Sequence, residues 1–128
     1  RNSTKYTSVG ERVAKALQDK VAPLAIACCG SGTGVSLSAN KFKGVLACSC
    51  ESVATAQKLR AVNGGNCLCL GEMVVTPELG CQMAEVFINT PFEQTEFTPA
   101  MQAFWREGHE EMLRRGDIAG DRALETVP

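Results

Sequence analysis

The sequence lacks a strong excess of either charge, because 13 lysines and arginines face 14 aspartates and glutamates. A net charge of −1 excludes the electrostatic attraction that nucleic acids and anionic membrane surfaces require of a partner. No apolar run approaches the roughly 20 residues of a membrane span, and no signal peptide is visible. The chain begins at Arg1 rather than Met, which favours a fragment or a processed product. We therefore expect neither nucleic acid nor a membrane among its partners.

Histidine is almost absent, since His109 is the only one in 128 residues. It lies among Glu107, Glu110 and Glu111 in a segment with helical spacing, which favours a solvated helix face over a catalytic role.

Cysteine, in contrast, occurs seven times. The number is odd and most of these residues lie in apolar, strand-like runs, which favours free thiols in a reducing cytoplasm over a disulfide framework. The pairs Cys48/Cys50 and Cys67/Cys69 leave open a four-thiolate zinc site, but packing in a buried sheet is the favoured interpretation, so no metal is expected. Cys81, on a predicted helix, is expected to be a small core residue.

Hydrophobic patterning and turn signals predict an alternation of helices and strands. The predicted helices cover residues 8–18, 34–41, 52–62, 77–88 and 99–116, and the predicted strands cover 23–29, 44–50 and 67–70. The first helix begins with a capping-box pattern, Ser8 with Glu11. The fourth begins with Thr76-Pro77, an N-cap followed by proline at the first helical position.

This order predicts an α/β fold: a Rossmann-like parallel β-sheet flanked by helices on both faces, with a C-terminal helical extension. We expect a single domain over residues 1–116 and a loosely ordered tail over residues 117–128. Ligands of such sheets bind outside the carboxyl ends of the strands.

The stretch Cys29-Gly-Ser-Gly-Thr-Gly34 lies at such a strand end and opens a helix. Glycines let a backbone approach a ligand closely, and successive N–H groups at a helix start cradle an anion. The same positive field lowers the pKa of a thiol, so Cys29 could act as a general base while the N–H groups hold an oxyanion. A tight turn with a buried thiol explains the pattern equally well.

Four motifs follow one another in a characteristic order: "CGSGTGVSLSANK", "GVLA", "NGGNCLCLG" and "ELGCQMAEVFINTPFE". Over roughly residues 6–93 this order resembles the type B ribose-5-phosphate isomerase and galactose-6-phosphate isomerase family. The resemblance implies an aldose–ketose isomerase that moves a proton through an enediolate on a small sugar or sugar phosphate, without a cofactor. It implies these roles: Cys29 as the base, Ser31 as the adjacent hydroxyl, Gly30, Gly32 and Gly34 as the oxyanion loop, and Asn63 and Tyr6 as substrate-binding residues.

Several positions depart from the family pattern. The first strand of the family, with its Asp-His pair, has no counterpart here, and the ring-opening histidine falls on Val62. Three phosphate-binding arginines fall on Met73, Glu96 and Ala100, none of which can form a bidentate phosphate contact; Arg106 is the nearest possible replacement. The departures predict an unphosphorylated sugar, or one whose charged group is held elsewhere, in an open-chain or readily opening form.

A non-catalytic sugar- or anion-binding or regulatory protein on the same fold stays open as the alternative. The last helix carries Phe104 and Trp105, and the resemblance implies paired subunits that share their active sites. We therefore expect a homodimer or a dimer of dimers.

Overall fold

A small parallel sheet forms the centre of the protein, whose computed structural model describes residues 4–93 and 96–118. The strands are β1 (Ala25–Cys29), β2 (Ala47–Ser49) and β3 (Cys67–Gly71), in the order β1-β3-β2. The helices are α1 (Tyr6–Gln18), α2 (Thr33–Ala39), α3 (Val53–Ala61), α4 (Pro77–Asn89) and α5 (Pro99–Ile118). The predicted alternation of helices and strands is confirmed. The expected loose tail falls outside the described residues from position 119 on.

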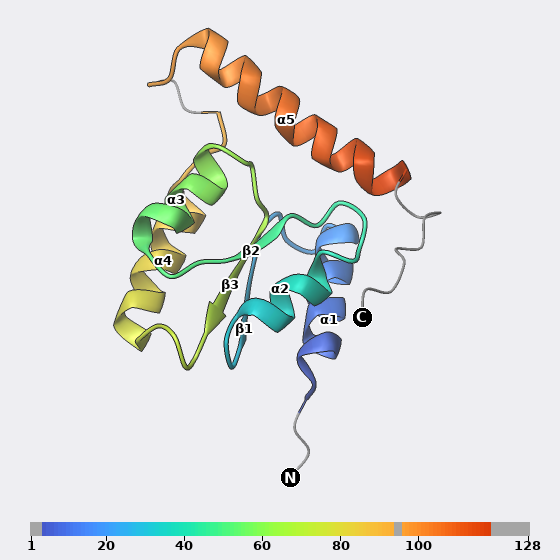
Figure 1. The fold of residues 1–128 in the computed structure, drawn as a ribbon, viewed down its shortest axis with the longest axis vertical. Helices are drawn as coiled ribbons and strands as arrows, with labels where there is room; N and C mark the ends of the chain where they lie inside the picture. Colours follow the sequence, from blue (N-terminus) through green and yellow to red (C-terminus); the bar gives the residue numbers. More distant parts are fainter. Residues whose placement is uncertain (1–3, 94–95, 119–128) are drawn as a thin grey trace, which may run out of the picture.

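Alternate residues of the central strand β3 face two separate cores. Cys67 and Cys69 pack with α1 and α2, whereas Leu68 and Leu70 pack with α3 and α4. Figure 1 shows these two helix pairs on opposite sides of the sheet. All five residues of β3 are buried, as a parallel strand covered on both faces requires. The predicted arrangement, with helices on both faces, is therefore confirmed.

The two cysteine pairs that suggested zinc belong to different cores. Cys67 and Cys69 lie on the α1/α2 side, with their sulfurs 3.8 Å apart. Cys48 and Cys50 pack on the α3/α4 side, where burial and the adjacent Cys48 sulfur raise the pKa of Cys50 to about 12. Four thiols on opposite faces of a sheet cannot ligate one ion. Cys81 is exposed on α4, so its predicted place in the core is wrong.

The start of α1 differs from the prediction. The helix begins at Tyr6, two residues before Ser8, and no side chain caps its first turn, so the predicted capping box is wrong. The Tyr6 ring instead covers Gly34, where an added Cβ would lie 2.9 Å from the ring. Packing against the next helix along the chain, rather than a local cap, accounts for this start.

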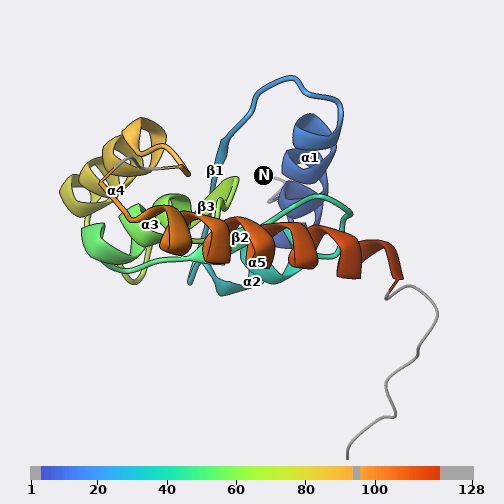
Figure 2. The ribbon, with the colours of Figure 1, turned by 90° about the horizontal axis from the view of Figure 1, so that it is seen from above.

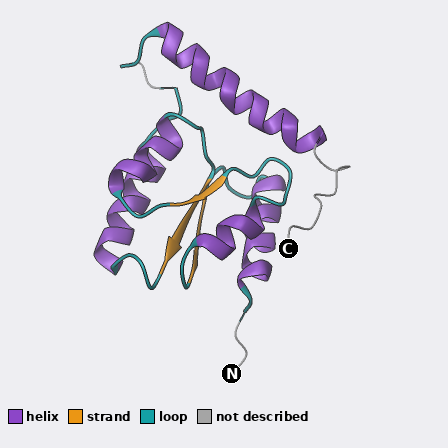
Figure 3. Cartoon of the chain, viewed as in Figure 1, coloured by secondary structure: helices purple, strands orange, loops and turns teal. Residues whose placement is uncertain are grey.

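The extension α5 lies beyond the amino ends of the strands, at the end of the sheet away from the arrowheads (Figure 3). Figure 2 shows it crossing in front of β2. Its apolar side chains are largely uncovered: Phe104 is 72% exposed and Met101 is 42% exposed. No helix among the described residues combines the length and apolarity that crossing a bilayer needs.

A matched pair of glycine substitutions tests the close packing of α1 on α2. A Cβ at Gly10 would lie 2.7 Å from the Ser38 Cβ and 2.9 Å from the Ala39 backbone nitrogen, whereas a Cβ at Gly108 would meet nothing within 4 Å. We expect Gly10→Ala to lower the free energy of unfolding by about 1–3 kcal/mol and Gly108→Ala to raise it by about 0.5–1 kcal/mol. Urea titration measures both values, and an undiminished stability of Gly10→Ala would contradict this account.

Candidate active site

The turn between β1 and α2 wraps its backbone around the Cys29 sulfur. Gly32 adopts φ +81°, a left-handed conformation that a side chain would strain. This conformation aims the Gly32 N–H at the Cys29 Sγ, to which it donates a hydrogen bond of 3.1 Å. The hydroxyls of Ser31 and Thr33 lie 2.7 Å apart on the same turn. The turn therefore places a thiol, amide donors and hydroxyls together.

These amides favour the thiolate form of Cys29. Burial by itself would raise the pKa of the Cys29 thiol, but hydrogen bonds from the backbone N–H groups of the turn hold it below its ordinary value. The N–H groups belong to Val35, Gly32, Ser31 and Gly34. The neighbouring Cys28 behaves oppositely, since burial and the charge of Cys29 raise its pKa. The structure therefore distinguishes two adjacent thiols, of which only Cys29 is activated.

The end of β3 holds this turn in place. The Glu72 N–H donates to the Cys29 carbonyl at 3.0 Å, and the Met73 N–H donates to the Gly30 carbonyl at 2.8 Å. Gly71 makes the approach possible, because a Cβ there would lie 2.4 Å from the Ser31 carbonyl carbon. Any side chain at position 71 would therefore clash with the backbone of the turn.

A cavity of about 710 Å³ opens beside the Cys29 thiol. Most predicted site residues line it: Tyr6, Cys29, Gly30, Ser31 and Gly34. Met73, where the family pattern has an arginine, also lines it and is 78% exposed. Its methyl carbon would lie 2.9 Å from a Cβ at Gly30, so it lies over the turn. An apolar thioether therefore occupies the part of the wall where the family pattern has an arginine.

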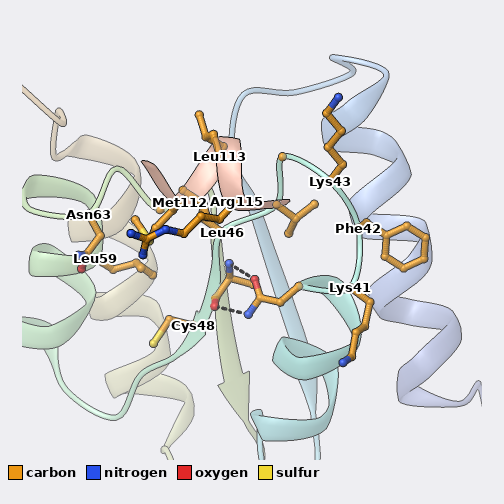
Figure 4. Close-up of a pocket in the computed structure, with 15 residues that line it drawn as sticks. Lys41, Phe42, Lys43, Leu46, Cys48, Leu59, Asn63, Met112, Leu113 and Arg115 are labelled. Atoms are coloured by element: carbon orange, nitrogen blue, oxygen red, sulfur yellow. Dashed lines mark hydrogen bonds between the residues drawn. The ribbon is translucent and has the colours of Figure 1, made fainter. Parts of the chain in front are cut away.

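Asn63 does not join this cavity within one chain. The register pairs Cys29 with Gly71, so β3, five residues at about 3.3 Å each, separates the thiol from the connection that carries Asn63. Asn63 instead lines a cavity of about 750 Å³ at the other end of the sheet. Figure 4 shows Asn63 on one side of that cavity and Lys41 on the other, with Arg115 between them.

His109 is half-exposed on α5 and makes a tertiary contact that its interpretation as a solvated residue did not include. Its Nδ1 lies 2.9 Å from the Asn63 carbonyl oxygen, and its ring lies 4.8 Å from that of Phe92. Gly64, at φ +62°, leaves room for the imidazole, because a Cβ there would lie 2.6 Å from Nδ1. His109 thus fastens α5 to the Asn63 turn. The contact spans 46 residues, and no local pattern signals it.

The remaining positions of the lost phosphate clamp carry no cation. Glu96 is exposed, and Ala100 is exposed in the first turn of α5. Arg106, the possible replacement, forms an ion pair with Glu93 at 2.6 Å. Val62 lines a cavity of about 510 Å³ with Asn63 and His109, again away from Cys29.

Comparison with known proteins gives consistent matches. The family model described as Ribose/Galactose Isomerase matches residues 1–103. The chain is 47% identical over 70 residues to a 4-deoxy-4-sulfo-D-erythrose isomerase of Clostridium sp. (strain MSTE9), covering 55% of this chain and 44% of that protein. It is 29% identical over 106 residues to a D-erythrulose-4-phosphate isomerase of Pectobacterium atrosepticum, covering 83% and 70%. The chain thus spans less than half the length of the first of these relatives.

The fold also matches solved structures. The type B ribose 5-phosphate isomerase of Trypanosoma cruzi superimposes with a TM-score of 0.82 and 28% identity, over 93% of this chain and 73% of that one. The parallel sheet with helices on both faces is therefore shared with a solved isomerase.

Selective alkylation tests the activation of Cys29. We expect iodoacetamide near neutral pH to modify Cys29 before any other thiol, including the exposed Cys28 and Cys81, because the turn amides favour its thiolate. Its rate should reach half-maximum below pH about 8.5, the ordinary value for a thiol. Mass spectrometry of timed digests measures this profile. A midpoint at or above that value would contradict the assignment.

Proposed function

The chain belongs to the ribose/galactose isomerase family, and from that premise we propose that it interconverts an aldose and a ketose by proton transfer at Cys29. The observation that carries the proposal is the Cys29 sulfur held at 3.1 Å from the Gly32 N–H inside an open cavity. The relatives named above are isomerases, and nothing in the comparisons favours the non-catalytic alternative.

The residues of the turn provide a balanced reaction. The Cys29 thiolate removes the proton from C2 of the aldose, and the C–H electron pair forms the C1–C2 double bond while the aldehyde electrons move to O1. The backbone N–H groups that surround the thiol stabilise this enediolate. Transfer of a proton from O2 to O1, and return of the thiol proton to C1, gives the ketose. Ser31 and Thr33 offer hydroxyls for the transfer between oxygens. No electron acceptor, metal or organic cofactor takes part.

The substrate we propose is an open-chain four-carbon sugar with an acid group at C4. Val62 offers no acid–base group for ring opening. A four-carbon aldose whose C4 bears a sulfonate or phosphate has no free C4 hydroxyl to attack its aldehyde, so it needs no ring opening. The names of two relatives, a sulfoerythrose isomerase and an erythrulose-4-phosphate isomerase, describe substrates of this kind. The absence of an acid–base side chain and these names support the same substrate class.

We further propose that two copies of the chain complete each active site, in a homodimer or a dimer of dimers. Asn63 lies at the opposite end of the sheet from Cys29, and the α5 helix that adjoins it exposes Phe104 and Met101. An antiparallel two-fold pairing would bring the Asn63 end of one subunit to the Cys29 end of the other. All seven cysteines are free thiols, which supports a reducing, cytoplasmic location.

Substrate comparison tests the reaction. We expect turnover of 4-deoxy-4-sulfo-D-erythrose or D-erythrose 4-phosphate to exceed that of ribose 5-phosphate by at least about tenfold in kcat/KM. Cys29→Ala should abolish exchange of the C2 proton with deuterated water, measured by NMR, while leaving the unfolding midpoint close to that of the parent. Higher turnover of the five-carbon sugar would contradict the proposed substrate, and undiminished exchange in Cys29→Ala would remove Cys29 from the mechanism.

Mixing two inactive variants tests the shared site. Cys29→Ala and Asn63→Ala each damage every site of their own dimers, but a mixed dimer contains one site with both residues intact. After unfolding and refolding an equimolar mixture, we expect about a quarter of the parent activity. Analytical ultracentrifugation should show a dimer or larger at micromolar concentration. Failure of the mixture to regain activity, or a monomer in solution, would show that the two residues do not act across an interface.

A further inference from the structure

The cavity beside Cys29 contains a single cationic side chain among the described residues, that of Lys5. The other lining residues are apolar, hydroxyl-bearing or thiol side chains and glycines, with no carboxylate among them. No carboxylate of the lining therefore repels an anion. The Cys29 thiolate is the one anionic group there, and the Lys5 ammonium is the one group that attracts an anion.

The packing of α1 fixes the place of Lys5 relative to the catalytic turn. Lys5 is the residue before the first turn of α1, and the Tyr6 ring next to it covers Gly34. The Ser38 hydroxyl donates to the Thr7 carbonyl at 3.0 Å, which joins the same turn to α2. Lys5 thus lies where α1 meets the turn that carries the thiol.

The ammonium of Lys5 is available for a ligand. Within residues 4–93 and 96–118 it makes no hydrogen bond or ion pair. Other cations are engaged: Lys15 pairs with Glu11 at 3.1 Å and Arg106 with Glu93 at 2.6 Å. A lysine without a protein partner on the wall of a substrate cavity is free to bind an anion of the substrate.

We propose that Lys5 binds the acid group at C4 of the substrate and so determines specificity for charged four-carbon sugars. The inference rests on the proposed function, because C4 is only two bonds from C2, and a group bound there must lie in the same cavity as the thiol. An ammonium is a point charge that pairs with sulfonate and phosphate alike, unlike the planar fork of arginine. Lys5 thereby takes over the task that Met73 cannot perform.

A second group of cations is the alternative binding site for the acid group of the substrate. Lys41, Lys43 and Arg115 line the cavity at the Asn63 end of the sheet (Figure 4). If subunits share their sites, Arg115 of one copy could approach the substrate of the other. It forms an ion pair with Glu111 at 3.6 Å and is 78% exposed. The variant Arg115→Met therefore distinguishes binding of the acid group by Lys5 from binding by Arg115 of a second copy.

Steady-state kinetics with three substrates tests the assignment. The substrates are 4-deoxy-4-sulfo-D-erythrose, D-erythrose 4-phosphate and the uncharged 4-deoxy-D-erythrose, which likewise cannot close a ring. We expect Lys5→Met to raise KM for both acids by about 10- to 100-fold with kcat within about twofold, because a uniform binding interaction is lost. Its kcat/KM for the uncharged sugar should equal that of the parent. Lys5→Arg should retain most affinity, and Lys58→Met, on the exposed surface of α3, serves as the matched control.

A measurement without turnover separates this inference from the proposed function. Sulfate and inorganic phosphate should slow the alkylation of Cys29 in the parent and in Lys58→Met, but not in Lys5→Met. Loss of this protection in Arg115→Met instead, or a KM for the acids that Lys5→Met leaves unchanged, would overturn the role of Lys5 while leaving the isomerase intact. An equal loss of kcat/KM on the uncharged sugar would also overturn it. The parent could instead fail to turn over all three sugars while anions still protect its Cys29 from alkylation in a way that depends on Lys5. That result would contradict the proposed reaction and leave the role of Lys5 intact.

Discussion

The contact between the end of β3 and the Cys29 turn is the constraint on which the rest of the site depends. Two backbone hydrogen bonds cross it, from Glu72 and Met73, and Gly71 provides the space for the Ser31 backbone. Because the turn is fixed here, its amides converge on the sulfur instead of on solvent. The lowered pKa of Cys29 follows from this convergence, since burial alone would act in the opposite direction.

Parallel strands impose a second constraint, on what one chain can bring together. Every carboxyl end lies at one edge of the sheet and every amino end at the other, so residues that end a strand and residues that precede one are separated by its length. Cys29 ends β1, whereas Asn63 precedes β3. His109 and Phe92 then hold α5 on the Asn63 turn, far from the thiol. A site that uses both residues therefore has to draw on two copies.

The features that the sequence predicted correctly are those with a local physical cause. Thr76 caps its helix through its own side chain, as predicted, and the burial of all five residues of β3 follows from helices covering both faces of a parallel sheet. The missed features are tertiary. Tyr6 begins α1 because its ring packs on Gly34, and His109 bonds a turn 46 residues away. The sequence motifs also did not predict that Asn63 lies away from Cys29, because both motifs match the family. Their separation became visible only in the structure, where Cys29 ends β1 and Asn63 precedes the parallel strand β3.

The proposed four-carbon substrate gives the departures from the family pattern one chemical explanation. A substrate that cannot close a ring removes the need for an acid–base group at Val62. A short substrate also brings its acid group close to the thiol, into a cavity whose wall at Met73 is apolar and whose only described cation is Lys5. On this proposal the histidine missing at Val62 and the arginine missing at Met73 are both consequences of a shorter sugar, and the thiol with its amide cradle is the part that proton transfer itself requires.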